Sequence, residues 1–145
     1  MHLFDLQHTV LAKHAQHVVL VHFPVALVVI ALLFDLIALR WRDGVWAAAA
    51  YYNLSVAAAA ALPVAITGLL AWRWQLEGAP LRGVLRLHLL FGLSSCVMIC
   101  VTWWVARRSI QTAKSRARRL GFELATVLVV ALTAHLGGFV SGINM

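Results

Sequence analysis

Four long apolar runs separated by short basic loops constrain this fold more than any other feature. The runs cover residues 18–39, 45–71, 84–106 and 120–143. A helix needs about 20 apolar residues to cross a hydrocarbon core of about 30 Å, and every run reaches that length. Strands of a membrane barrel are about half as long and alternate strictly between apolar and polar residues, which these runs do not. We predict an all-α protein, a bundle of four transmembrane helices.

Composition agrees with this interpretation. Hydrophobic residues make up 63% of the chain and charged residues only 12%, too little polar surface for a soluble domain. The loops are too short for a second domain, so we expect residues 1–145 to form one membrane domain.

Residues 1–17 lack the basic start and the cleavage site of a signal sequence, and they fit a short amphipathic helix lying on the membrane surface.

The distribution of lysine and arginine predicts the orientation. Of the 12 basic residues, eight lie on the side of the first and third loops and four on the other side. The larger group is Arg40, Arg42, Arg107, Arg108, Lys114, Arg116, Arg118 and Arg119, and the smaller is Lys13, Arg73, Arg82 and Arg86. The positive-inside rule then places the first and third loops in the cytoplasm and both termini outside. Topology and anionic lipids account for the net charge of +7, so we expect no nucleic-acid partner.

Three histidines lie inside the apolar runs and are the main candidates for a functional site. Counting at 1.5 Å per residue places His22, His88 and His135 roughly 7, 7 and 12 Å from the outer ends of their helices. An ionisable side chain within a membrane span is costly and commonly functional. Three imidazoles at a similar depth suggest a set of ligands.

A b-type haem is the cofactor that this arrangement favours. Its iron takes two imidazoles from facing helices, and we favour His88 with His135, leaving His22 as the third candidate and His17 as a reserve ligand. No C-x-x-C-H motif is present, so covalent attachment of haem is excluded.

Nearby residues could accommodate the rest of a haem. Gly92 and Gly138 would allow the porphyrin to approach the helix backbones, and Arg82 and Arg86 could pair with its propionates.

Two other interpretations of the histidines remain open. The same three residues, His22, His88 and His135, could hold a zinc, copper or iron ion. Alternatively, each histidine could simply hydrogen-bond a neighbouring helix, as polar residues in membrane bundles often do.

Two acidic residues lie toward the opposite side of the membrane. Asp35 and Glu123 are each about four residues from a helix end and within reach of Arg40 or Arg119. We expect salt bridges there, and a proton relay is the alternative function.

Several sequence patches resemble a family of small bacterial membrane proteins known as domain of unknown function 2231. The patches are HVVLVHFPVALVVIALLFDLIAL (residues 17–39), LPVAITGLLAW (62–72), LRLHLLFGL (85–93) and HLGGFVSG (135–142). The resemblance implies a four-helix membrane protein, sometimes joined to cytochrome-type domains, with no established activity. The positions that match recurring residues of the family are His17, His22, Asp35, Gly68 and His88.

The sequence therefore predicts an electron-transfer subunit that carries one b-type haem near the periplasmic face. Its expected partners are the lipid bilayer, other membrane subunits and a c-type cytochrome. The alternative from another class is a cofactor-free anchor or scaffold subunit of a larger respiratory or photosynthetic complex. The chain lacks soluble catalytic loops, so we do not expect enzyme activity from it alone.

Overall fold

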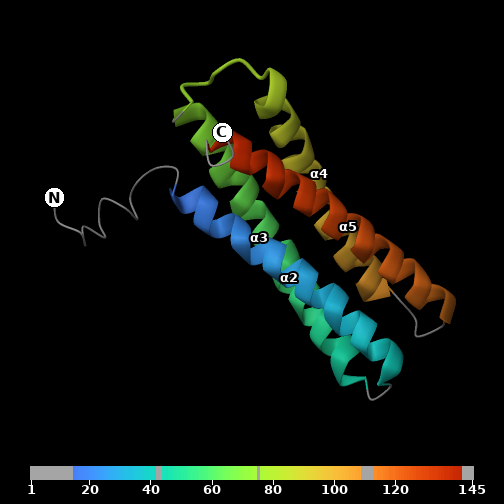
Figure 1. Cartoon of the computed structure of the whole chain (residues 1–145). Helices are drawn as coiled ribbons and strands as arrows, with labels where there is room; N and C mark the ends of the chain where they lie inside the picture. The colour runs from blue at the N-terminus through green and yellow to red at the C-terminus, as the bar shows by residue number, and fades with distance from the viewer. Residues whose placement is uncertain (1–14, 42–43, 75, 109–112, 142–145) are drawn as a thin grey trace.

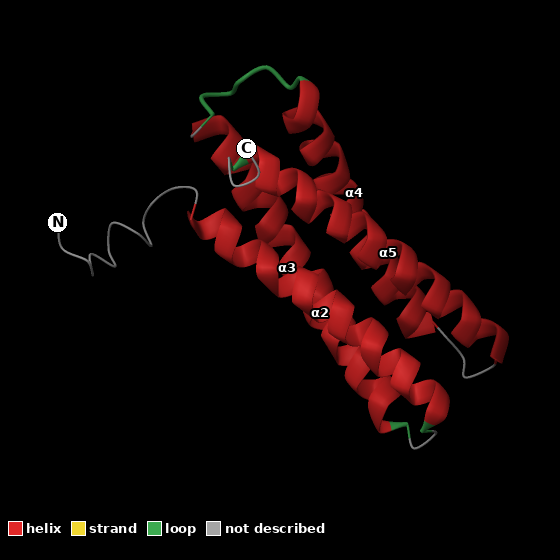
Figure 2. Cartoon of the chain, in the orientation of Figure 1, coloured by secondary structure: helices red, strands yellow, loops and turns green. Residues whose placement is uncertain are grey.

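The computed structural model describes residues 15–41, 44–74, 76–108 and 113–141. Four helices follow one another along the chain: α2 (Ala15–Arg40), α3 (Val45–Trp74), α4 (Gly83–Arg108) and α5 (Ala113–Val140) (Figure 1). Each is long and apolar enough to cross a membrane. The described part of the chain contains no strand (Figure 2), so the predicted all-α, four-helix membrane fold is confirmed. Most of the expected surface helix, residues 1–14, lies outside the described residues.

The helix boundaries differ most from the prediction at the start of α5. This helix begins at Ala113, seven residues before the apolar run. The added segment is rich in alanine, lysine and arginine, which are all good helix formers, so the helix extends beyond its apolar part.

The helices pack as a ring in antiparallel order. α2 packs against α3 and α5, and α4 packs against the same two helices. α2 and α4 therefore lie across the bundle from each other. The beginnings of α2 and α4 share one end of the bundle with the ends of α3 and α5 (Figure 1).

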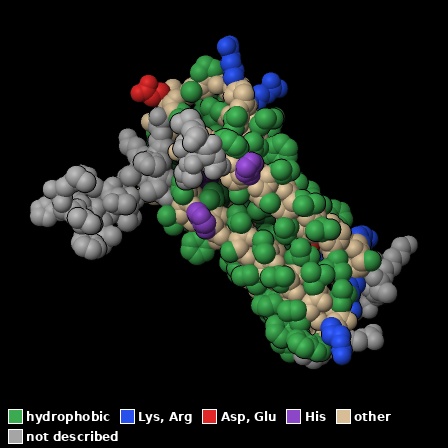
Figure 3. Space-filling model, in the orientation of Figure 1, with side chains coloured by type: hydrophobic (Ala, Val, Ile, Leu, Met, Phe, Trp, Pro, Cys, Tyr) green, Lys and Arg blue, Asp and Glu red, His purple; other side chains and the backbone are tan. Residues whose placement is uncertain are grey.

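Small side chains fill the centre of the bundle. Ala31, Ala50 and Ala57 are fully buried, and Ala61 is almost so. Small residues allow membrane helices to approach closely, which promotes packing where there is no hydrophobic force between them. Large apolar side chains cover the outside instead (Figure 3), as lipid contact requires.

Polar side chains gather at the two ends of the bundle. The histidine end, defined by His17, His22, His88 and His135, includes the starts of α2 and α4. The carboxylate end, defined by Asp35, Arg119 and Glu123, includes the end of α2 and the start of α5. The two ends offer separate sites.

Candidate functional site at the histidine end

His88 is half-buried on α4 and contacts α5 in two ways. Its Nδ1 lies 3.2 Å from the carbonyl oxygen of Thr133. Its ring also packs against Gly137, where a Cβ atom would lie 3.1 Å from Cε1 of His88. Because a carbonyl can only accept a hydrogen bond, Nδ1 must carry the proton. The Nε2 atom of the neutral ring therefore keeps a lone pair.

His17 of α2 contacts α3 in the same way as His88 contacts α5. Its Nδ1 lies 3.3 Å from the hydroxyl oxygen of Thr67. Thr67 has one hydroxyl hydrogen, and it points to carbonyls of its own helix, that of Pro63 at 2.9 Å and that of Val64 at 3.1 Å. The hydroxyl thus accepts from His17. A proton on Nδ1 satisfies this acceptor and leaves a lone pair on Nε2 of the neutral ring.

Gly68 makes room for the His17 ring. A Cβ atom at Gly68 would lie 2.9 Å from Cε1 of His17, closer than real Cβ contacts come. Both His17 and His88 are thus seated against a glycine and fixed through Nδ1 by the neighbouring helix.

His17 and His88 lie at the same end of the bundle, on α2 and α4, which are across the bundle from each other. His17 had been expected only as a reserve ligand.

His22 and His135 are both exposed side chains. Nδ1 of His22 lies 2.6 Å from the Val18 carbonyl oxygen of its own helix. The His135 ring meets Phe139 edge-on, with 5.1 Å between the ring centroids. Among the residues described, no three His, Cys, Asp or Glu side chains form a metal-binding group, so His22, His88 and His135 do not assemble into the three-ligand set considered from the sequence.

The other residues proposed to contact a haem lie near this end. Arg82 and Arg86 are exposed around the start of α4. A Cβ atom at Gly92 would make ordinary contact with Thr133, at 3.9 Å from its Cγ2 atom. The Gly138 carbonyl accepts a hydrogen bond of 3.0 Å from the Ser141 hydroxyl. Gly68 and Gly137 are the positions at which an added Cβ atom would meet a histidine ring among the glycines so described.

Sequence reasoning missed Thr67 and Thr133 as partners of the histidines. One signal could have identified them. Each is a polar residue within an apolar run and is followed within one turn by glycine: Thr67 by Gly68, and Thr133 by Gly137. Small and hydroxyl-bearing residues on membrane helices commonly mark contacts with a neighbouring helix.

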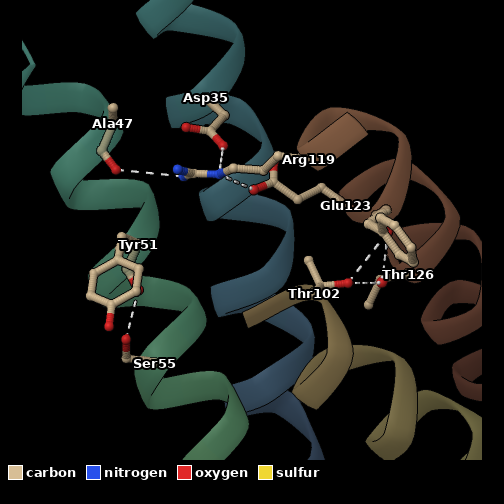
Figure 4. A network of polar contacts seen from close by, with 9 residues as sticks. Asp35, Ala47, Tyr51, Ser55, Thr102, Arg119, Glu123 and Thr126 are labelled. Carbon is tan, nitrogen blue, oxygen red and sulfur yellow. Dashed lines mark hydrogen bonds and ion pairs between the residues drawn. The ribbon is translucent and has the colours of Figure 1, made fainter. Parts of the chain in front are cut away.

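The carboxylate end contains the expected salt bridges. Arg119 Nε contacts the carboxylate of Asp35 and lies 3.0 Å from Oε1 of Glu123 (Figure 4). A second guanidinium nitrogen of Arg119 donates to the Ala47 carbonyl at 3.5 Å. Arg119 thereby connects α2, α3 and α5.

Comparison with protein families agrees with this architecture. A family model described as "Predicted membrane protein (DUF2231)" matches residues 13–142. The chain belongs to this family. Membership confirms the resemblance inferred from the sequence and identifies this DUF2231 protein as a predicted membrane protein. Neither the curated proteins nor the solved structures include a match to it.

Proposed function

We propose that this DUF2231 protein is a membrane electron-transfer subunit in which His17 and His88 hold the iron of one b-type haem. The observation that carries the proposal is that His17 on α2 and His88 on α4 each keep an Nε2 lone pair at the same end of the bundle. Low-spin b-type haems take two such imidazoles, one on each side of the ring.

The hydrogen bonds of the two rings favour a ligand role. Histidines that bind metals almost always donate their other ring N–H to a carbonyl or similar acceptor, which fixes the tautomer and the ring orientation. Thr133 provides that acceptor for His88, and Thr67 provides it for His17. The donor set thus fits a haem iron, which when bound would supply one-electron transfer.

The charges near this end also fit the proposal. Arg82 and Arg86 are exposed cations close to the first turn of α4 and could pair with haem propionates. Electrons would be exchanged with another membrane subunit or with a c-type cytochrome.

A cofactor-free scaffold subunit is the second candidate, and the same hydrogen bonds favour it. His17 links α2 to α3, and His88 links α4 to α5. Such bonds between membrane helices contribute about 0.6 kcal/mol on average, so they could serve packing alone.

Four alanine variants separate the two functions. Bound haem per chain would be measured after purification from haem-replete cells. The electron-transfer proposal predicts loss of haem, or conversion to a five-coordinate form, in His17→Ala and His88→Ala. The matched variants His22→Ala and His135→Ala should retain haem, because both side chains are exposed. Equal haem content in all four variants would reject His17 and His88 as the ligand pair. Absence of haem from the wild-type protein would favour the scaffold function.

A further inference from the structure

The carboxylate end contains two acids and one guanidinium in direct contact. The Glu123 side chain is fully buried and that of Asp35 is 7% exposed. Both are paired with Arg119 through the same nitrogen, Nε. If both acids were ionised, the three groups would carry a net charge of −1. An uncompensated buried charge is costly, and such a group commonly avoids the cost by neutralisation.

Few other groups approach the cluster to balance that charge. On α5, the charge of Arg116 acts on Asp35, but the Arg116 side chain is partly exposed, so its charge is partly screened. From α3, the Ala47 carbonyl accepts from Arg119.

The two threonine hydroxyl groups drawn near the cluster in Figure 4 are neutral and bonded elsewhere. Thr102 of α4 pairs with Thr126 of α5 at 2.7 Å. Thr126 also lies 2.7 Å from the Phe122 carbonyl oxygen, to which it donates. They supply no charge to the cluster.

One oxygen of the cluster lacks a donor. Oε2 of Glu123 is buried and has no hydrogen-bond partner among the described residues. The carboxyl groups of Glu123 and Asp35 nevertheless lie side by side, because both approach the same nitrogen of Arg119. Two ionised carboxylates offer only acceptors, so a bond between them requires a proton on one of them.

We propose that Asp35 and Glu123 share one exchangeable proton and form a proton-binding site at the carboxylate end. The proton adds to a carboxylate oxygen and the net charge of the three groups changes from −1 to zero. Release of the proton to water reverses the change. The site is separate from the histidine end, and the proposal does not depend on haem.

Infrared spectroscopy of the purified full-length protein tests the shared proton directly. At neutral pH we expect the C=O stretching band of a protonated carboxylic acid, with a shift in D2O. The band should disappear in Glu123→Gln and in Asp35→Asn, and it should be unchanged in Glu77→Gln, because Glu77 is exposed. Absence of the band from the wild type, or its persistence in both cluster variants, would overturn the proposal.

Thermal unfolding provides a second test that does not depend on assigning a band. In the pH range where an ordinary carboxyl is ionised, the folded protein would hold one more proton than the unfolded chain. Stability must then fall as the pH rises through the release of that proton. We expect this fall in the wild type and not in Glu123→Gln, where the amide replaces the protonated acid. Identical pH profiles for the two proteins would contradict a shared proton.

Discussion

The His88 ring of α4 packs directly against Gly137 of α5, where a Cβ atom would lie 3.1 Å from Cε1 of His88. His17 packs against Gly68 in the same way. Both glycines act at a helix contact and not through any unusual backbone conformation. The orientation of each imidazole therefore depends on a glycine, which has no side chain, in the neighbouring helix.

This relationship predicts the effect of Gly68→Ala. The added methyl group would meet His17 at 2.9 Å, so the ring must move. Overpacking of this kind typically costs about 1–3 kcal/mol. We expect a lower unfolding temperature and, if haem is bound, a changed haem spectrum.

Gly121→Ala is the matched control, because no atom lies within 4 Å of its Cβ position. That variant should be stabilised by about 0.5–1 kcal/mol. Equal effects at the two positions would argue against the packing of His17 on Gly68.

Removal of the Arg119 charge should be strongly destabilising. Arg119→Met leaves two carboxyl groups without the cation that pairs with them, and breaking a buried pair typically costs about 3–5 kcal/mol. Arg118→Met provides the control, since Arg118 is exposed on the same helix. Unfolding in denaturant would compare the two variants. Similar stabilities would show that the Arg119 cluster contributes little to the fold.

The split of basic residues predicts the orientation in the membrane. A reporter fused after Met145 should be periplasmic, and one inserted near Lys114 should be cytoplasmic. Labelling with a membrane-impermeant reagent would distinguish the two sides. The opposite pattern would place the histidine end at the cytoplasmic face.

The membrane fold was predictable because the length and apolarity of each run are local properties of the sequence. The extension of α5 to Ala113 was not, because the residues before the apolar run are polar and yet form helix readily. Hydropathy marks the part of a helix in lipid and gives no signal where the same helix continues beyond it.

The sequence predicted the position of the histidines along their helices but not the direction of their side chains. Counting along the helices placed His22, His88 and His135 at one end of the bundle, where the structure also has them. A helix that is apolar all round, as α2 is between Phe23 and Phe34, has no polar face to show which side points inward. The sequence therefore could not establish that His17 faces the bundle while His22 is exposed.

The central claim is that the histidine end holds a haem, and a reduced-minus-oxidised absorption spectrum tests it most directly. The full-length protein would be purified from haem-replete cells and measured before and after reduction with dithionite. We predict the spectrum of a low-spin b-type haem, with a Soret band and a sharp α band in the reduced state, at one haem per chain. A protein that folds and remains monodisperse without any Soret band would contradict the account.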